Sequence, residues 1–129
     1  MVSITFHTIW GKHRVVESKL QTNIVDHAIK CDMVAYKVEA KGKNGFPDSF
    51  IARDGWVELW EVKSPKKTGR YQPSQKKRIP ELLRAGVIVR RVDNYDTAKY
   101  IFHYWAEQDS FLGPAAGTRL TFGDFSQTD

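Results

Sequence analysis

The chain of 129 residues contains a single cysteine, Cys31, so no disulfide can form within it. A buried, reduced thiol is expected there, which fits a reducing compartment. Apolar runs are also short. None approaches the ~20 residues that span a bilayer, and the N-terminus lacks the basic and apolar regions of a secretory signal. These absences predict a soluble, cytoplasmic protein with no membrane contact.

Several functional motifs are missing as well. No GxxxxGK[ST] or GxGxxG loop is present, so nucleotide hydrolysis and dinucleotide binding lack their backbone cradle for phosphates. The four histidines show no HxxxH spacing, and with one cysteine a zinc site is not expected. Each histidine is therefore assigned to packing or to the surface. With 41% hydrophobic and 12% aromatic residues, the composition supports one core, and a single domain over 1–129 is predicted.

Basic residues outnumber acidic ones, twenty to fifteen, and the formal charge of +5 is concentrated in the middle of the chain. Residues 63–91 hold ten basic side chains and one acid, Glu81. Each Lys or Arg that displaces a counterion from a polyanion adds to the affinity for it, so this block is a candidate nucleic-acid surface. The alternative is an ordinary solvated face. The expected nucleic-acid contacts are Lys66, Lys67, Arg70, Lys76, Lys77 and Arg78.

Hydrophobic periodicity divides the chain into alternating helices and strands. Helices are expected at about 15–29, from Ser74 to Gly86 with a kink or break at Pro80, and from an Asp93–Asn94 cap to about residue 105. Strands are expected at 33–40, 48–53, 56–63 and 87–92. The order α-β-β-β-α-β-α is a mixed α/β architecture, with helices packed on a sheet. The core covers about 15–105, and the tail 109–129 has no clear period.

A hairpin between the second and third strands brings charged side chains together. Asp54–Gly55 suits a two-residue turn, in which facing residues have numbers that sum to 109, so Asp48 faces Glu61. Two carboxylates directly opposed repel each other, and Lys63 lies two residues beyond on the same pleat face. The alternative is the common Glu-X-Lys triplet of an exposed salt bridge.

This arrangement suits a divalent cation and a phosphodiester. Mg²⁺ takes oxygen ligands, one or two of them carboxylates, and lowers the pKa of a bound water. Lys63 would orient or stabilise the attacking hydroxide. Glu17 would add a ligand, directly or through water, if the first helix packs over the sheet edge.

Two further patterns have alternative interpretations. Trp56 and Trp60 share the opposite pleat face, where they would pack under a helix, pack at a dimer interface, or stack on bases. The triplet Val89–Arg91 contains Arg90 and Arg91, which would contact phosphate or protect an edge strand.

The segments GFPDSF (45–50) and LWEVK (59–63), followed by Gln75, resemble the PD-(D/E)xK nuclease superfamily. They are similar specifically to its VRR-NUC branch, whose pattern is Glu on a first helix, G-x-PD, E-V-K and Gln at the start of the next helix. The segment VIVRRVDN (87–94) resembles the closing strand of that branch, so the resemblance covers roughly 15–105. It implies a restriction-endonuclease-like core. Pro80 and the tail after Trp105 depart from the pattern.

The resemblance also implies roles for individual residues. Asp48 and Glu61 would bind the metal together with the backbone carbonyl of Val62, Lys63 would be the catalytic lysine, and Glu17 and Gln75 would support metal or substrate. Small stand-alone members occur in bacteriophages and bacteria, resemble Holliday-junction resolvases, and act as homodimers that cut branched DNA with Mg²⁺ or Mn²⁺. A metal-dependent, structure-specific DNA endonuclease is therefore expected. The alternatives are a nuclease acting on flap, nicked or duplex DNA, and a non-catalytic nucleic-acid-binding module.

Overall fold

The computed structural model describes residues 11–42, 44–64, 71–107 and 117–125, with the side chains of 11–17 excepted. The elements in these ranges are α1 (Gly11–Lys30), β1 (Val34–Lys37), β2 (Ser49–Arg53), β3 (Trp56–Val62), α2 (Pro73–Arg84), β4 (Val89–Val92), α3 (Tyr95–Glu107), β5 (Thr118–Arg119) and the 3₁₀ turn η1 (Phe122–Phe125). Among them, no helix combines the length and apolarity needed to cross a membrane. The predicted mixed α/β order is confirmed.

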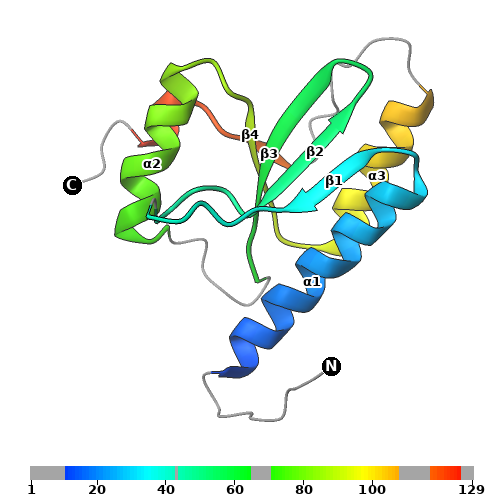
Figure 1. Ribbon diagram of the computed structural model, residues 1–129, viewed down its shortest axis with the longest axis horizontal. Coiled ribbons are helices and arrows are strands. Elements are labelled where there is room, and N and C mark those ends of the chain that lie inside the picture. The colour runs from blue at the N-terminus through cyan, green and yellow to red at the C-terminus, as the bar shows by residue number, and fades with distance from the viewer. Residues whose placement is uncertain (1–10, 43, 65–70, 108–116, 126–129) are drawn as a thin grey trace.

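The five strands form one mixed sheet in the order β1-β2-β3-β4-β5. Only β3 and β4 pair in parallel, and the other neighbours are antiparallel. A parallel pair needs a crossover connection, which α2 supplies here. In Figure 1, α2 lies on one side of the sheet, and α1 and α3 lie together on the other. The start of α2 is thus near the end of β3.

The hairpin register agrees with the sequence prediction. Ala52 pairs with Val57 and Arg53 with Trp56, as the Asp54–Gly55 turn requires. Both turn residues have positive φ, 47° and 85°, as a type I′ turn demands. The pleat therefore directs odd-numbered residues of β3 to one face and even-numbered residues to the other.

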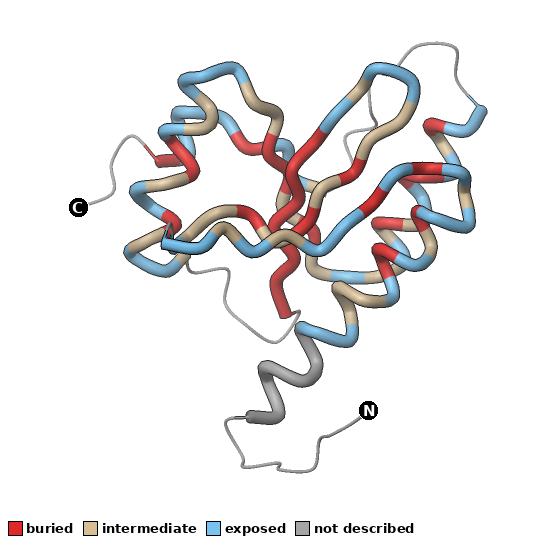
Figure 2. Tube along the Cα trace, viewed as in Figure 1, coloured by how far each residue is buried: buried red, intermediate tan, exposed pale blue. Residues whose placement is uncertain are grey.

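Each face of β3 belongs to a separate apolar cluster. Trp60 and Val62 pack with α1 and α3, where Trp60 stacks on Phe102 with ring centroids 5.1 Å apart. Leu59 packs with α2 through Ile79 on the other face. Figure 2 shows the buried stretch of β3 running between the two layers. Of the alternatives for Trp60, packing under a helix is the one observed.

β1 buries its small side chain and exposes its large ones. Ala35 is buried beneath α1, whereas Val34 and Tyr36 are 49% and 62% exposed. β1 is an edge strand, and its outer face is not covered by α2. The helix therefore covers the side of the strand that carries Ala35, and the larger apolar side chains of Val34 and Tyr36 face away from it.

Helix α2 is continuous through Pro80, so the break predicted there is wrong. Proline removes one intrahelical hydrogen bond, but the bonds of the other turns remain and the Pro80 ring is buried. The helix is also capped earlier than expected, at Gln72 instead of Ser74. Its end agrees with prediction, since Gly86 follows with φ +87°.

The segment described as irregular in sequence contains ordered structure. β5 pairs with β4, and η1 follows it. Leu120 and Phe125 are buried against the α2 layer. A two-residue strand has no periodicity to detect, which is why the pattern missed it.

Because β5 covers β4, the predictions for the Val89–Arg91 triplet need correction. β4 is an inner strand, so Arg90 does not protect an edge. Its side chain is buried and bonds to Glu58, which removes it from any phosphate. Arg91 is half-buried and lies 3.6 Å from the carboxylate of Asp93.

Candidate active site

The loop before β2 is in close contact with the first turn of α2. Gly45 has φ +88°, and a Cβ at this position would lie 2.3 Å from the carbonyl oxygen of Ser74. Only glycine permits both the backbone conformation and the approach. Pro47, two residues later, is buried. The G-x-PD segment thus places Asp48 between the end of β3 and the first turn of α2.

Asp48 is held at both its backbone and its side chain. Its carboxylate accepts the backbone N–H of Val62, at 3.3 and 3.2 Å to the two oxygens, and the Ser49 hydroxyl at 2.9 Å. Its carbonyl oxygen accepts the Gln21 amide at 2.6 Å and the N–H of Val38 at 2.8 Å. Bonds from α1, β3 and the extension of β1 therefore fix the carboxylate beside β3.

Glu61, Lys63 and Gln75 form a buried network at the end of β3. The Lys63 Nζ lies 3.3 Å from Glu61 Oε2 and donates to Gln75 Oε1 at 2.8 Å. The Gln75 amide in turn donates to Glu61 Oε2 at 2.5 Å. Glu61 and Lys63 are only 4% and 5% exposed. The predicted glutamate, lysine and glutamine are thus in mutual contact.

The first turn of α2 fixes the orientation of the Gln75 amide. Besides Lys63, Gln75 Oε1 accepts the backbone N–H of Gln72 at 2.9 Å. This bond satisfies a helix N-terminal donor that has no partner within the helix. The amide nitrogen is thereby directed at Glu61.

Tyr71 is a neighbour that the sequence did not single out. Its ring centroid lies 5.5 Å from Lys63 Nζ, close enough for a cation–π contact. Burial, with a smaller effect of the Glu61 and Asp124 charges, raises the pKa of Tyr71 to about 12 against an opposing effect of Arg91. The phenol therefore stays protonated at neutral pH. No local motif marks a tyrosine four residues before Gln75, so only packing reveals it.

Two positions on α1 relate to this site. Gln21, which sequence reasoning did not assign, bonds to both Asp48 and the Ser49 hydroxyl, the latter at 3.2 Å. Glu17 occupies the position one turn earlier in α1, and its side chain lies outside the described residues. The helix does pack at this edge of the sheet, as the prediction for Glu17 required.

The predicted nucleic-acid contacts are only partly described. Lys76 and Lys77 are exposed on α2, next to Gln75. Arg78 is half-buried and bonds to Glu81 at 2.7 Å. Lys66, Lys67 and Arg70 lie outside the described residues. Of the predicted contacts that the structure describes, Lys76 and Lys77 are thus the exposed ones.

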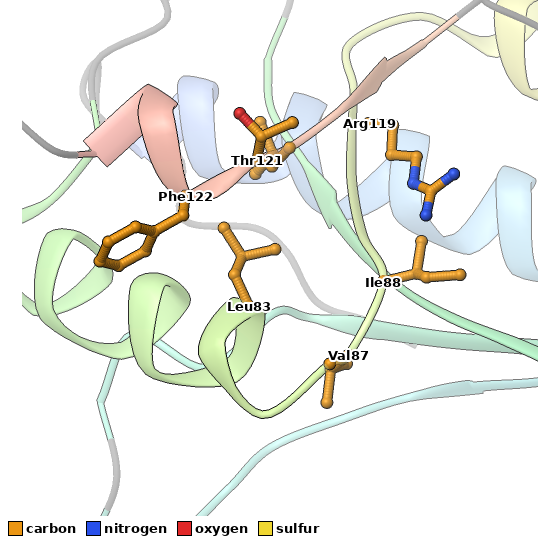
Figure 3. A pocket seen from close by; sticks show the side chains of 8 residues that line it. Leu83, Val87, Ile88, Arg119, Thr121 and Phe122 are labelled. Carbon is orange, nitrogen blue, oxygen red and sulfur yellow. The ribbon is translucent and has the colours of Figure 1, made fainter.

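A hollow of about 410 Å³ lies elsewhere, where the end of α2 meets β5 and η1. Figure 3 shows Leu83, Val87, Ile88, Thr121 and Phe122 around it, with Arg119 at its edge. None of the candidate catalytic residues lines this hollow. Its lining offers no acid–base pair.

The chain resembles known proteins at the level of structure. No family model matches the sequence, and no curated protein matches it. Among solved structures, one described as "VRR_NUC domain" superimposes with a TM-score of 0.58 over 69% of this chain and 96% of the other, at 17% sequence identity. This chain has the VRR_NUC fold. The VRR_NUC fold is restriction-endonuclease-like, so the fold class expected from the sequence is confirmed.

Proposed function

We propose that this chain is a metal-dependent DNA endonuclease that hydrolyses phosphodiester bonds. The observation that carries the proposal is the buried contact of Lys63, Glu61 and Gln75 beside the anchored carboxylate of Asp48. The likeness to a structure described as a VRR_NUC domain supports a nuclease.

The burial of this network is itself an argument for function. Removing a lysine and a glutamate from water costs several kcal/mol per ion, on the order of what their attraction returns. A well-packed apolar pair would serve stability as well. Charges retained at such cost, next to a second carboxylate, are typical of catalytic sites.

The donors fit Mg²⁺ or Mn²⁺. Asp48 and Glu61 would hold the ion with the backbone carbonyl of Val62, and all three offer the oxygen atoms that these cations prefer. Glu17 would contribute through water. When bound, the ion would lower the pKa of a water molecule and neutralise charge that develops on the phosphate.

The protein side chains would position the reactants. The ammonium group of Lys63 would donate a hydrogen bond to the attacking hydroxide or to a phosphate oxygen. This bond would stabilise negative charge in a site that excludes bulk water. Gln75 acts through its neighbours, since it bonds to Lys63 and Glu61 together and keeps them in place. Lys76 and Lys77, exposed beside it, would contact the DNA backbone.

We propose branched DNA as the substrate and a homodimer as the active form. A four-way junction has two equivalent strands to cut, and a two-fold dimer would present two equivalent sites to them. Asp48, Glu61, Lys63 and Gln75 account for one site per chain.

The test is a cleavage assay with end-labelled four-way junction, flap and linear duplex DNA in Mg²⁺, Mn²⁺ or EDTA. We expect cutting of the junction that needs the metal and is reduced at least ~10³-fold by Lys63→Ala or Asp48→Ala, as for loss of groups that stabilise the transition state. Lys30→Ala is the matched control for Lys63→Ala, and Asp26→Ala is the matched control for Asp48→Ala. Each control removes a charge of the same sign from the exposed surface of α1. Circular dichroism would verify that all variants fold.

The other outcomes separate the alternatives. Cutting of flaps or duplex in preference to the junction would keep the chemistry and change the substrate. Binding of DNA without cutting in either metal would contradict an enzyme and favour a non-catalytic module. Light scattering on the free and DNA-bound protein would measure the oligomeric state.

A further inference from the structure

Three side chains with metal-binding atoms meet between α1 and α3, on the face of the sheet opposite α2. They are His27 of α1, Cys31 directly after the last residue of α1, and His103 of α3, and their ligand atoms all lie within 4.8 Å of one another. Cys31 is four residues after His27 and its backbone N–H donates to the His27 carbonyl at 3.0 Å, so the two side chains lie on the same side of the helix end. The sequence predicted no zinc site because this third ligand comes from a distant helix.

The two imidazoles are already oriented toward a common point. Their Nε2 atoms are 3.1 Å apart. Two imidazole ligands on a tetrahedral zinc ion, with Zn–N bonds of about 2.0–2.1 Å, would place their nitrogens about 3.4 Å apart. A shift of a few tenths of an ångström would bring the two imidazole nitrogens to this separation.

Other contacts fix the His27 ring. Its Nδ1 lies 3.2 Å from the Tyr95 hydroxyl, and its ring stacks on buried Phe102 with centroids 6.2 Å apart. Histidine ligands commonly bond through their second nitrogen to such a partner, which fixes the ring and leaves the first nitrogen to the metal. Here Nδ1–H would donate to the Tyr95 oxygen and Nε2 would face the ion.

From this geometry we propose that His27, Cys31 and His103 bind one Zn²⁺ ion that fastens the end of α1 to α3. A thiolate and two imidazoles are ligands that zinc prefers, whereas the oxygen donors of Asp48 and Glu61 suit a hard cation. His103 is exposed, so the ion has access from solvent and water fills its fourth position. Binding replaces the Cys31 S–H bond with an S–Zn bond and releases one proton to solvent.

Burial and neighbouring charges change the pKa of two of the three proposed ligands. Burial, followed by the charges of His103, Lys99 and Lys30, lowers the pKa of His27, which keeps its ring in the neutral form that binds metal. Burial and Asp32 raise the pKa of the Cys31 thiol, against the opposing effect of Arg53. The ion must therefore displace a proton at Cys31 but none at His27.

The test uses untagged, metal-free protein titrated with Co²⁺ as a spectroscopic probe and then with Zn²⁺. We expect one tetrahedral Co²⁺ per chain, recognised by its visible bands and by a near-ultraviolet thiolate-to-cobalt band, and loss of these bands as Zn²⁺ displaces Co²⁺. Because Cys31 is the only cysteine, that thiolate band has one source. Zn²⁺ should also raise the melting temperature.

Variants make the result decisive. Cys31→Ser should remove the thiolate band, His103→Ala should weaken binding more than ~10-fold, and Tyr95→Phe should weaken it by about 10-fold while keeping the tetrahedral bands. Asp26→Asn on α1 and Asp48→Ala in the other site should leave binding unchanged. A wild-type protein without the thiolate band, or a band that survives Cys31→Ser, would overturn the site. Neither result depends on whether the protein cleaves DNA.

Discussion

Gly45 shows how a single residue positions the candidate site. The backbone of this loop touches the first turn of α2, so the segment carrying Asp48 and the helix carrying Gln75 are joined without any side chain between them. The conformation at Gly45, φ +88°, is one that other residues rarely adopt. The glycine of the G-x-PD motif thus has a steric role.

Gly45 and Gly86 allow the cost of the positive φ and the cost of the close backbone contact to be measured separately. Gly86 has nearly the same φ, +87°, but a Cβ there would meet open space. We expect Gly86→Ala to lower the free energy of unfolding by about 1–2 kcal/mol, the cost of a left-handed conformation. Gly45→Ala should cost about 1–3 kcal/mol more, because its Cβ also collides with the backbone of Ser74.

Urea unfolding of the two variants measures this difference. Equal losses would mean that the loop moves away from α2 at no cost, and the contact would then not position Asp48. A cleavage defect confined to Gly45→Ala would agree with the positioning role.

At the scale of elements, β3 is the strand that contributes buried side chains to the apolar clusters on both faces of the sheet. Its odd-numbered side chains form the candidate site, and its even-numbered side chains include Glu58, which is fully buried. Arg90 of β4 donates to both carboxylate oxygens of Glu58, at 2.7 and 3.0 Å. The indole nitrogens of Trp56 and Trp60 donate to the same two oxygens. This pair joins β3 to β4 on the face of the sheet opposite the candidate site.

Breaking the pair should be costly. We expect Glu58→Leu alone, or Arg90→Met alone, to lower the free energy of unfolding by about 3–5 kcal/mol, since each leaves a buried partner without its counter-charge. The double variant should lose less than the sum of the two single losses, and chemical denaturation of all four proteins gives the coupling. Strictly additive losses would show that the two side chains do not stabilise each other.

Elements with local signals were predictable from the sequence. The Asp54–Gly55 turn determined the register that brings Asp48 and Glu61 to the same end of the hairpin, and Gly86 marked the end of α2. Asn94 was predicted as a cap, and its Oδ1 accepts the N–H of Thr97 at 2.8 Å. Turn and cap residues act within a few positions, so one sequence is enough to read them.

What escaped prediction depends on contacts between distant segments. Arg90 reads as a surface charge until Glu58 is placed beside it, and Cys31 is half-buried instead of buried because it lies at the edge of the α1–α3 contact. Gln21 bonds to Asp48 across 27 positions. The buried Lys63–Glu61–Gln75 contact was anticipated only through resemblance to a family pattern. Spacing alone carries no information on such packing.

At the scale of the whole molecule, the excess positive charge bears on DNA binding. The formal charge is +5, and exposed Lys76 and Lys77 follow Gln75 directly in α2. Each phosphate contact releases counterions, so the affinity falls as salt is raised. The number of lysines that contact DNA is thus measurable from the salt dependence.

We expect the affinity for junction DNA, measured in EDTA to prevent cutting, to fall by about 10³-fold or more between 50 and about 200 mM salt if six or more phosphates are contacted. Lys76→Ala and Lys77→Ala should each reduce the slope of log K against log salt by about one. Lys30→Ala, in the α1 layer, should leave the slope unchanged. A flat salt dependence in the wild type would exclude this basic surface as the DNA contact.

The position of the site residues along the chain has a consequence for how the molecule assembles. Asp48, Glu61, Lys63 and Gln75 all belong to one continuous stretch, residues 48–75, whereas α1 and α3 join segments near opposite ends of the described chain. Loop-closure entropy is smaller for short separations, so contacts within the stretch form at lower cost than the docking of α3 on α1. We therefore expect the contacts around the candidate site to form earlier in folding than the packing of α3 on α1.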